Sequence, residues 1–196
     1  TYQGYGLFSY DRPRVSTVAP SGGNAAGGLP VTITGSSFGD ADTDPVGFVG
    51  ATRCKRTLYV SDTSLVCVTP PGGGRDLPVE AEVGGQRSAA AGGAGFGYAP
   101  PRVLYLEPTE GPVGGGARVT VFGRNFGRTG AARSVAYVGP LACRNTTWVS
   151  DREVLCVSPR GADLYVRHPV TVRTEGVPSP REPRAQYAFI EGPPPG

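Results

Sequence analysis

The sequence predicts an all-β protein made of two tandem β-sandwiches, and three observations support this fold class. The chain repeats itself at a spacing of about 88 residues, so its 196 residues contain two similar halves. Its 31 glycines and 20 prolines interrupt every stretch that could form an amphipathic helix. Short β-branched runs recur between turn residues, which is the pattern of a sandwich or barrel.

The repeat consists of matching blocks whose spacing changes only between blocks. Four of them are Pro13–Val15 with Pro101–Val103, Val31–Gly35 with Val119–Gly123, Phe38-Gly39 with Phe126-Gly127, and Pro78-Val79 with Pro169-Val170. The spacing is 88 residues in the first three, 89 at the cysteines and 91 in the last. Such changes are typical of loops that differ in length between two copies of one fold.

Domain boundaries follow from this repeat. We expect residues 12–99 and 100–191 to form the two domains, and 192–196 to form a proline-rich linker. Phe8-Ser9-Tyr10 matches the Phe-x-Tyr that closes the first repeat, so residues 1–11 are expected to hold the last strand of a preceding repeat.

The junction between the two domains is expected to be stiff. Ala99-Pro100-Pro101 joins the repeats without a flexible spacer. Proline fixes one backbone torsion and favours extended chain. The sequence therefore predicts an end-to-end array of domains.

The β-branched runs give the expected strands. They are Val31–Thr34, Leu65–Thr69, Val79–Val83, Val119–Phe122, Val154–Val157 and Val170–Val172. Alternation along a strand predicts that Val31 and Ile33 face the core while Thr32 faces solvent. Glycine plus proline makes up about a quarter of the chain, so a disordered, low-complexity chain is the alternative. The strand runs and the register of the repeat argue against it.

Charge and hydropathy exclude two classes of partner. The net charge is +3, carried by scattered arginines with Lys55 as the one lysine, whereas a nucleic-acid-binding protein gathers basic residues on one face. No apolar run approaches the roughly 18 residues needed to span a bilayer. We therefore expect neither nucleic acid nor membrane contact within this segment.

Each repeat carries two cysteines with twelve residues between them, Cys54 and Cys67 in the first and Cys143 and Cys156 in the second. Four cysteines can pair in three ways, and one bridge inside each repeat is the simplest because each copy has to fold by itself. Closing a loop of about 14 residues stabilises a domain by roughly 3 kcal/mol. Free buried thiols are the alternative. A zinc site is disfavoured, since there is no Cys-x-x-Cys and the one histidine is His168.

Asn145-Thr146-Thr147 is an N-glycosylation acceptor triplet, expected on a polar turn just after Cys143. Such triplets also arise by chance. Beside a predicted disulfide framework, however, the triplet favours a secreted or cell-surface protein.

The candidates for metal binding and catalysis are weak. Asp40, Asp42 and Asp44 alternate as calcium ligands do, but Pro45 and Ala51 replace the glycine and the acidic residue of a helix–loop–helix site. A solvated loop is the alternative, and we expect no metal and no cofactor. No nucleophile–base pair recurs in both copies, so the sequence predicts a protein that is not an enzyme.

Taken together, the blocks resemble IPT/TIG domains, the immunoglobulin-like folds of plexin-type and fibrocystin-type ectodomains. The resemblance covers nearly the whole chain, twice, and implies two immunoglobulin-like sandwiches of the early-set type. It rests on the Pro-x-Val strand, the Gly-Gly turn, Gly-x-x-Phe-Gly, Val-Gly before the first cysteine, and Thr/Ser-Pro after the second. The first copy departs at Ser21-Gly22-Gly23, where Gly-Pro is usual, and this affects only a turn.

The resemblance and the residues together favour a non-catalytic structural or adhesive segment of a large extracellular or cell-surface glycoprotein. It would act as a stiff spacer and packing surface toward other protein chains and neighbouring repeats. A flagellar or cell-wall surface is a candidate setting, because the Ala/Pro/Gly/Arg composition is similar to that of such glycoproteins. The alternatives are a ligand-binding receptor ectodomain and an accessory module of a secreted carbohydrate-active enzyme. An intracellular dimerisation domain is a further one, which the cysteines and the acceptor triplet disfavour.

Overall fold

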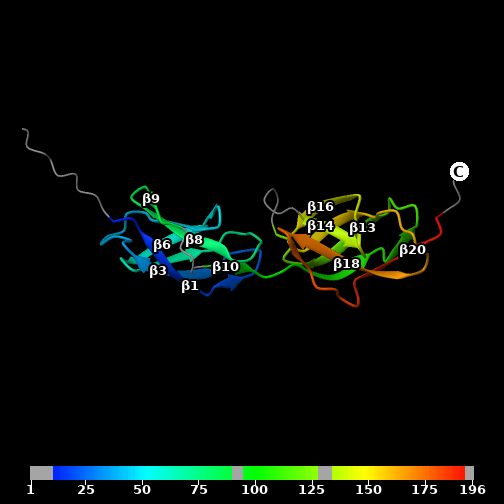
Figure 1. Ribbon diagram of the computed structural model, residues 1–196, viewed down its shortest axis with the longest axis horizontal. Coiled ribbons are helices and arrows are strands. Elements are labelled where there is room, and N and C mark those ends of the chain that lie inside the picture. The colour runs from blue at the N-terminus through cyan, green and yellow to red at the C-terminus, as the bar shows by residue number, and fades with distance from the viewer. Residues whose placement is uncertain (1–10, 90–94, 128–133, 193–196) are drawn as a thin grey trace, which may run out of the picture. The chain divides into compact units, whose positions relative to one another are not determined.

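The computed structural model describes residues 11–89, 95–127 and 134–192 (Figure 1). All regular structure in these ranges is β-strand, which confirms the predicted fold class. The chain divides into two compact units. Strands β1–β10 pair among themselves and strands β11–β20 pair among themselves. The closing strand of a preceding repeat, expected around Phe8-Ser9-Tyr10, lies outside the described residues.

The first sandwich packs a four-stranded sheet against a six-stranded one. The four-stranded sheet has the order β1 (Arg14–Ala19), β3 (Pro30–Ser36), β7 (Ser64–Val68), β6 (Arg56–Ser61). The other has the order β2 (Gly22–Gly23), β10 (Gly95–Tyr98), β8 (Leu77–Val83), β4 (Val46–Val49), β5 (Thr52–Arg53), with β9 (Gln86–Arg87) beside β8. Pairing is antiparallel except between β2 and β10, so the chain forms an immunoglobulin-like sandwich.

The second sandwich repeats this topology strand for strand. Its four-stranded sheet has the order β11 (Arg102–Glu107), β13 (Arg118–Arg124), β17 (Glu153–Val157), β16 (Asn145–Ser150). Its six-stranded sheet has the order β12 (Glu110–Pro112), β20 (Gln186–Ile190), β18 (Arg167–Thr174), β14 (Ser134–Val138), β15 (Leu141–Ala142), with β19 (Val177–Pro178) beside β18. The short first strand of this sheet, β12, again pairs parallel to the last strand, β20.

The core of each sandwich lies between its two sheets, and strand alternation supplies it. Val31 and Ile33 are buried and Thr32 is exposed, as the sequence predicts. Phe38 and Phe126 are fully buried just beyond the ends of β3 and β13. Each phenylalanine therefore closes the core at one end of its sandwich.

The glycine that precedes each of these phenylalanines has a packing role. A Cβ on Gly35 would overlap the carbonyl oxygen of Arg14 and would lie 2.6 Å from the Phe38 ring. A Cβ on Gly123 would overlap the carbonyl oxygen of Arg102 and the Phe126 ring in the same way. The first strand of each sandwich carries a β-bulge beside this glycine. The Gly-x-x-Phe spacing thus lets one ring and one bulged strand approach the same backbone.

Candidate functional site

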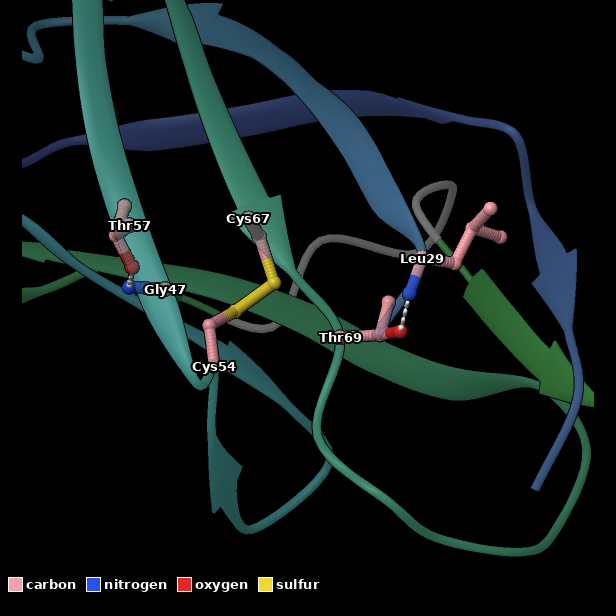
Figure 2. Close-up of a disulfide and its surroundings, with 6 residues drawn as sticks. All are labelled: Leu29, Gly47, Cys54, Thr57, Cys67 and Thr69. Carbon is pink, nitrogen blue, oxygen red and sulfur yellow. Dashed lines mark hydrogen bonds between the residues drawn. A yellow bond between two sulfur atoms is a disulfide. The ribbon is translucent and has the colours of Figure 1, made fainter. Parts of the chain in front are cut away.

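The structure brings the four cysteines together in two disulfides, one inside each sandwich. Cys54 bonds Cys67 with a Cα–Cα distance of 5.7 Å, and Cys143 bonds Cys156 at 5.6 Å (Figure 2 shows the first). Each bridge spans a sequence separation of 13 and ties the start of a hairpin to its second strand. The segment between the cysteines is mostly a β-hairpin, formed by β6 and β7 in the first sandwich and by β16 and β17 in the second.

Hydroxyl groups hold the backbone on both sides of each bridge. In the first sandwich the Gly47 N–H donates to Thr57 Oγ1 (2.7 Å) and the Leu29 N–H donates to Thr69 Oγ1 (3.1 Å), both drawn in Figure 2. Thr69 is buried, and its hydroxyl accepts the N–H of the partly buried Leu29, so the buried polar side chain has a hydrogen-bond partner. Sequence reasoning missed these hydroxyls.

The second sandwich repeats both contacts with different residues. The Ala136 N–H donates to Thr146 Oγ1 (3.0 Å), and the Ala117 N–H donates to Ser158 Oγ (3.0 Å). Thr146 and Ser158 stand 89 residues after Thr57 and Thr69, the same spacing as the cysteines. The repeat spacing was therefore the signal that could have found them.

Asn145 lies on an edge strand and not on the predicted turn. It is the first residue of β16, which forms one edge of the four-stranded sheet. Strand alternation leaves Asn145 and Thr147 exposed and turns Thr146 inward. Asn145 Nδ2 donates to Thr147 Oγ1 (3.3 Å), so the two outward residues of the acceptor triplet contact one another.

The Asp40, Asp42 and Asp44 side chains are not gathered into a metal site. Among the described residues, no group of three or more acidic, cysteine or histidine side chains is arranged to hold a metal ion. Asp42 Oδ1 instead accepts the Asp44 N–H (3.1 Å), which stabilises the turn. Desolvation, followed by the Asp62, Asp40 and Asp42 carboxylates, raises the pKa of the nearby Tyr59 hydroxyl.

A cleft of about 440 Å³ opens at one end of the first sandwich. Its lining includes the acidic residues Asp11, Asp40 and Asp62 and the apolar residues Pro13 and Val83. Asp62 Oδ1 accepts the Gly39 N–H (2.9 Å), so this carboxylate also orders the adjoining loop.

The second sandwich keeps that loop contact. Asp151 Oδ1 accepts the Gly127 N–H (3.2 Å). Desolvation raises the pKa of the Asp151 carboxyl, although the Gly127 and Asn125 N–H groups and Arg152 act in the opposite direction. The carboxylate thus has the same place in both sandwiches: it lies in the turn of the β6–β7 or β16–β17 hairpin and accepts an N–H from the loop that follows the Gly-x-x-Phe motif.

The outer face of the four-stranded sheet differs between the sandwiches. In the second, Tyr105 of β11 stacks on Phe122 of β13, with ring centroids 4.6 Å apart. The matching positions of the first sandwich are Thr17 and Thr34, which are also opposite one another in the sheet. His168, the single histidine, packs its ring against Phe189 in the second sandwich.

These features define a pair of immunoglobulin-like sandwiches, each with its own disulfide at an equivalent position. The IPT/TIG domain family matches residues 13–98 and 101–186, and the chain belongs to this family.

The relatives in sequence are plexins. Plexin-2 of Caenorhabditis briggsae is 27% identical over 168 residues, which cover 84% of this chain and 9% of that protein. Plexin-B3 of Homo sapiens is 32% identical over 149 residues, which cover 74% of this chain and 8% of that protein. The chain therefore spans less than a tenth of the length of these relatives.

The similarity to a solved structure supports the fold and says nothing about function. The surface glycan-binding protein PbSGBP-B from Prevotella bryantii matches with a TM-score of 0.56 over 91% of this chain and 42% of that chain. Its sequence is 12% identical. In the part of the chain that the structure describes, no helix has the length and hydrophobicity needed to cross a membrane.

Proposed function

We propose that the chain is a non-catalytic, stiff spacer and protein-packing segment of a large extracellular or cell-surface glycoprotein of the plexin type. Its two domains extend over residues 12–99 and 100–191, and its partners are other protein chains and neighbouring repeats. The paired disulfides support an oxidising compartment, since such bridges persist outside the cytosol. The membership in the IPT/TIG family and the plexin relatives support the ectodomain setting.

The connection between the domains is the observation that carries the spacer role. Only Ala99–Pro101 separates β10 from β11. The Ala99 N–H donates to the Gly23 carbonyl (2.7 Å), and the Pro100 carbonyl accepts from Asn125 Nδ2 (3.1 Å). A short, proline-containing connection with its backbone groups already bonded has few alternative conformations. This supports limited reorientation of one domain against the next.

Small-angle X-ray scattering of the secreted protein tests the spacer role. The matched control inserts a flexible Gly/Ser segment between Ala99 and Pro100, which leaves both sandwiches unchanged. We expect the unaltered protein to give one narrow distribution of interatomic distances, and the insertion to broaden it. Asn125→Ala removes the hydrogen bond to the Pro100 carbonyl and is expected to give a distribution of intermediate width. A distribution of interatomic distances that is as broad for the unaltered protein as for the insertion variant would contradict the spacer role.

A ligand-binding receptor ectodomain is the second candidate, and the plexin relatives favour it. The full-length parent chain separates the candidates. A kinase or GTPase-regulating region would favour a receptor, dozens of similar repeats would favour a scaffold such as a flagellar or cell-wall surface, and a hydrolase domain would favour an accessory module.

A further inference from the structure

The acceptor triplet lies where a glycan would rest on apolar side chains. On the outer face of the four-stranded sheet, Asn145 is opposite Val157 of β17, and Thr147 is opposite Leu155. Neighbouring strands are about 4.8 Å apart, so the first sugar on Asn145 would lie directly beside these two side chains. Leu155 and Val157 are only half-buried by the protein itself. The sheet therefore leaves apolar surface beside the attachment point.

Asn145 also stands on the free edge of this sheet. Strand β16 pairs with β17 on one side, and in the described residues it ends the sheet on the other. An unpaired edge can add a strand from another chain, which proteins commonly prevent with bulky or charged groups. A branched glycan at the start of β16 would block such pairing.

The first sandwich has the same local geometry without an acceptor asparagine. Arg56 and Leu58 occupy the positions of Asn145 and Thr147, and they lie opposite Val68 and Val66. Thr57 turns inward, as Thr146 does, to accept a backbone N–H. The triplet is therefore not needed to build the hairpin, because the equivalent hairpin forms without it.

We propose that Asn145 carries an N-linked glycan whose first sugars cover Leu155 and Val157, so that this sheet face and edge of the second sandwich are shielded from protein partners. The same face of the first sandwich stays open for packing. The inference rests on the secretory setting of the proposed function, and it does not depend on the stiffness of the junction.

The test uses the whole chain secreted from a eukaryotic cell line. Intact mass before and after enzymatic removal of N-glycans shows whether Asn145 is modified, and Thr147→Ala and Thr147→Ser are the matched variants. Thr147→Ser keeps the acceptor triplet and is expected to keep the glycan, whereas Thr147→Ala destroys it. A wild-type protein that is secreted at its unmodified mass overturns the inference.

Hydroxyl-radical footprinting then measures whether the side chains are covered. We expect glycosylated protein to lose labelling at Leu155 and Val157 relative to Thr147→Ala. Labelling at Val66 and Val68 of the first sandwich is the internal control and is expected to stay constant. Equal labelling of Leu155 and Val157 with and without the glycan overturns the shielding.

A transplanted acceptor supplies the reverse experiment. Arg56→Asn combined with Leu58→Thr places the triplet on β6, and it is expected to add a glycan and reduce labelling at Val66 and Val68. A glycan there without reduced labelling also contradicts the shielding. A protein without the glycan but with a narrow distribution of interatomic distances would contradict this inference and support the spacer role. A glycosylated protein with a broad distribution would support this inference and contradict the spacer role.

Discussion

The two sandwiches share their interior and differ on their surface. Both contain a disulfide with a sequence separation of 13, and both bury a serine that accepts a backbone N–H at 3.1 Å, Ser88 in the first and Ser179 in the second. On the outer face of the four-stranded sheet, Tyr105 stacks on Phe122 where the first sandwich has threonines. Either set of outward residues is compatible with the same fold. The comparison therefore separates residues that build the sandwich from residues that are free to serve contacts.

The shared disulfides predict the largest effects. Replacing Cys143 and Cys156 together by alanine is expected to lower the free energy of unfolding of the second sandwich by about 3 kcal/mol. Trp148 is the one tryptophan and packs against that core, so its fluorescence during denaturation reports the second sandwich selectively. Replacing Cys54 and Cys67 is expected to leave this transition unchanged. If both double variants shifted the Trp148 unfolding transition equally, the two sandwiches would not be separate folding units.

The shared glycines predict the next largest effect. Gly123→Ala and Gly35→Ala are each expected to destabilise their own sandwich by about 2 kcal/mol, because the added Cβ overlaps a backbone carbonyl and a buried ring. Gly114→Ala is the matched control, since a Cβ there meets no atom within 4 Å. Calorimetry of the three variants measures the difference. If Gly123→Ala behaved like Gly114→Ala, the packing role assigned to the motif would be wrong.

The divergent surface predicts the smallest effect. Tyr105→Thr combined with Phe122→Thr copies the first sandwich onto the second, and it is expected to cost about 1 kcal/mol, the value of a partly exposed aromatic pair. Denaturation followed by Trp148 fluorescence checks this. Thr17→Ala combined with Thr34→Ala in the first sandwich is the control, and it is expected to leave the Trp148 transition unchanged. A loss as large as that of the disulfide would mean that the aromatic pair is part of the folding framework.

The fold was largely predictable because the repeat marks the residues that build it. Both cysteine pairs, the Phe38 and Phe126 positions, and the alternation of buried Val31 and Ile33 with exposed Thr32 all lie in blocks that recur in both copies. Where the fold requires the same type of residue in both repeats, a single sequence shows the requirement, because the residue recurs at the equivalent position. The inward hydroxyls of Thr57 and Thr146 were equally visible in this respect and were overlooked.

The surface was less predictable, for a physical reason. Asn145 was expected on a turn because polar residues are common there, but an edge strand also exposes alternate residues to water. The stack of Tyr105 on Phe122 joins two strands through their sheet register, and it has no counterpart in the first copy. Contacts that occur once have no internal repeat to reveal them.

The central claim is that each repeat is a separate sandwich stapled by its own bridge in an oxidising compartment. Peptide mapping of the secreted, unreduced protein tests it most directly. We expect two linked peptide pairs, Cys54 with Cys67 and Cys143 with Cys156, and no thiol that reacts before reduction. Reactive thiols, or a bridge that joins a cysteine of one repeat to a cysteine of the other, would contradict it.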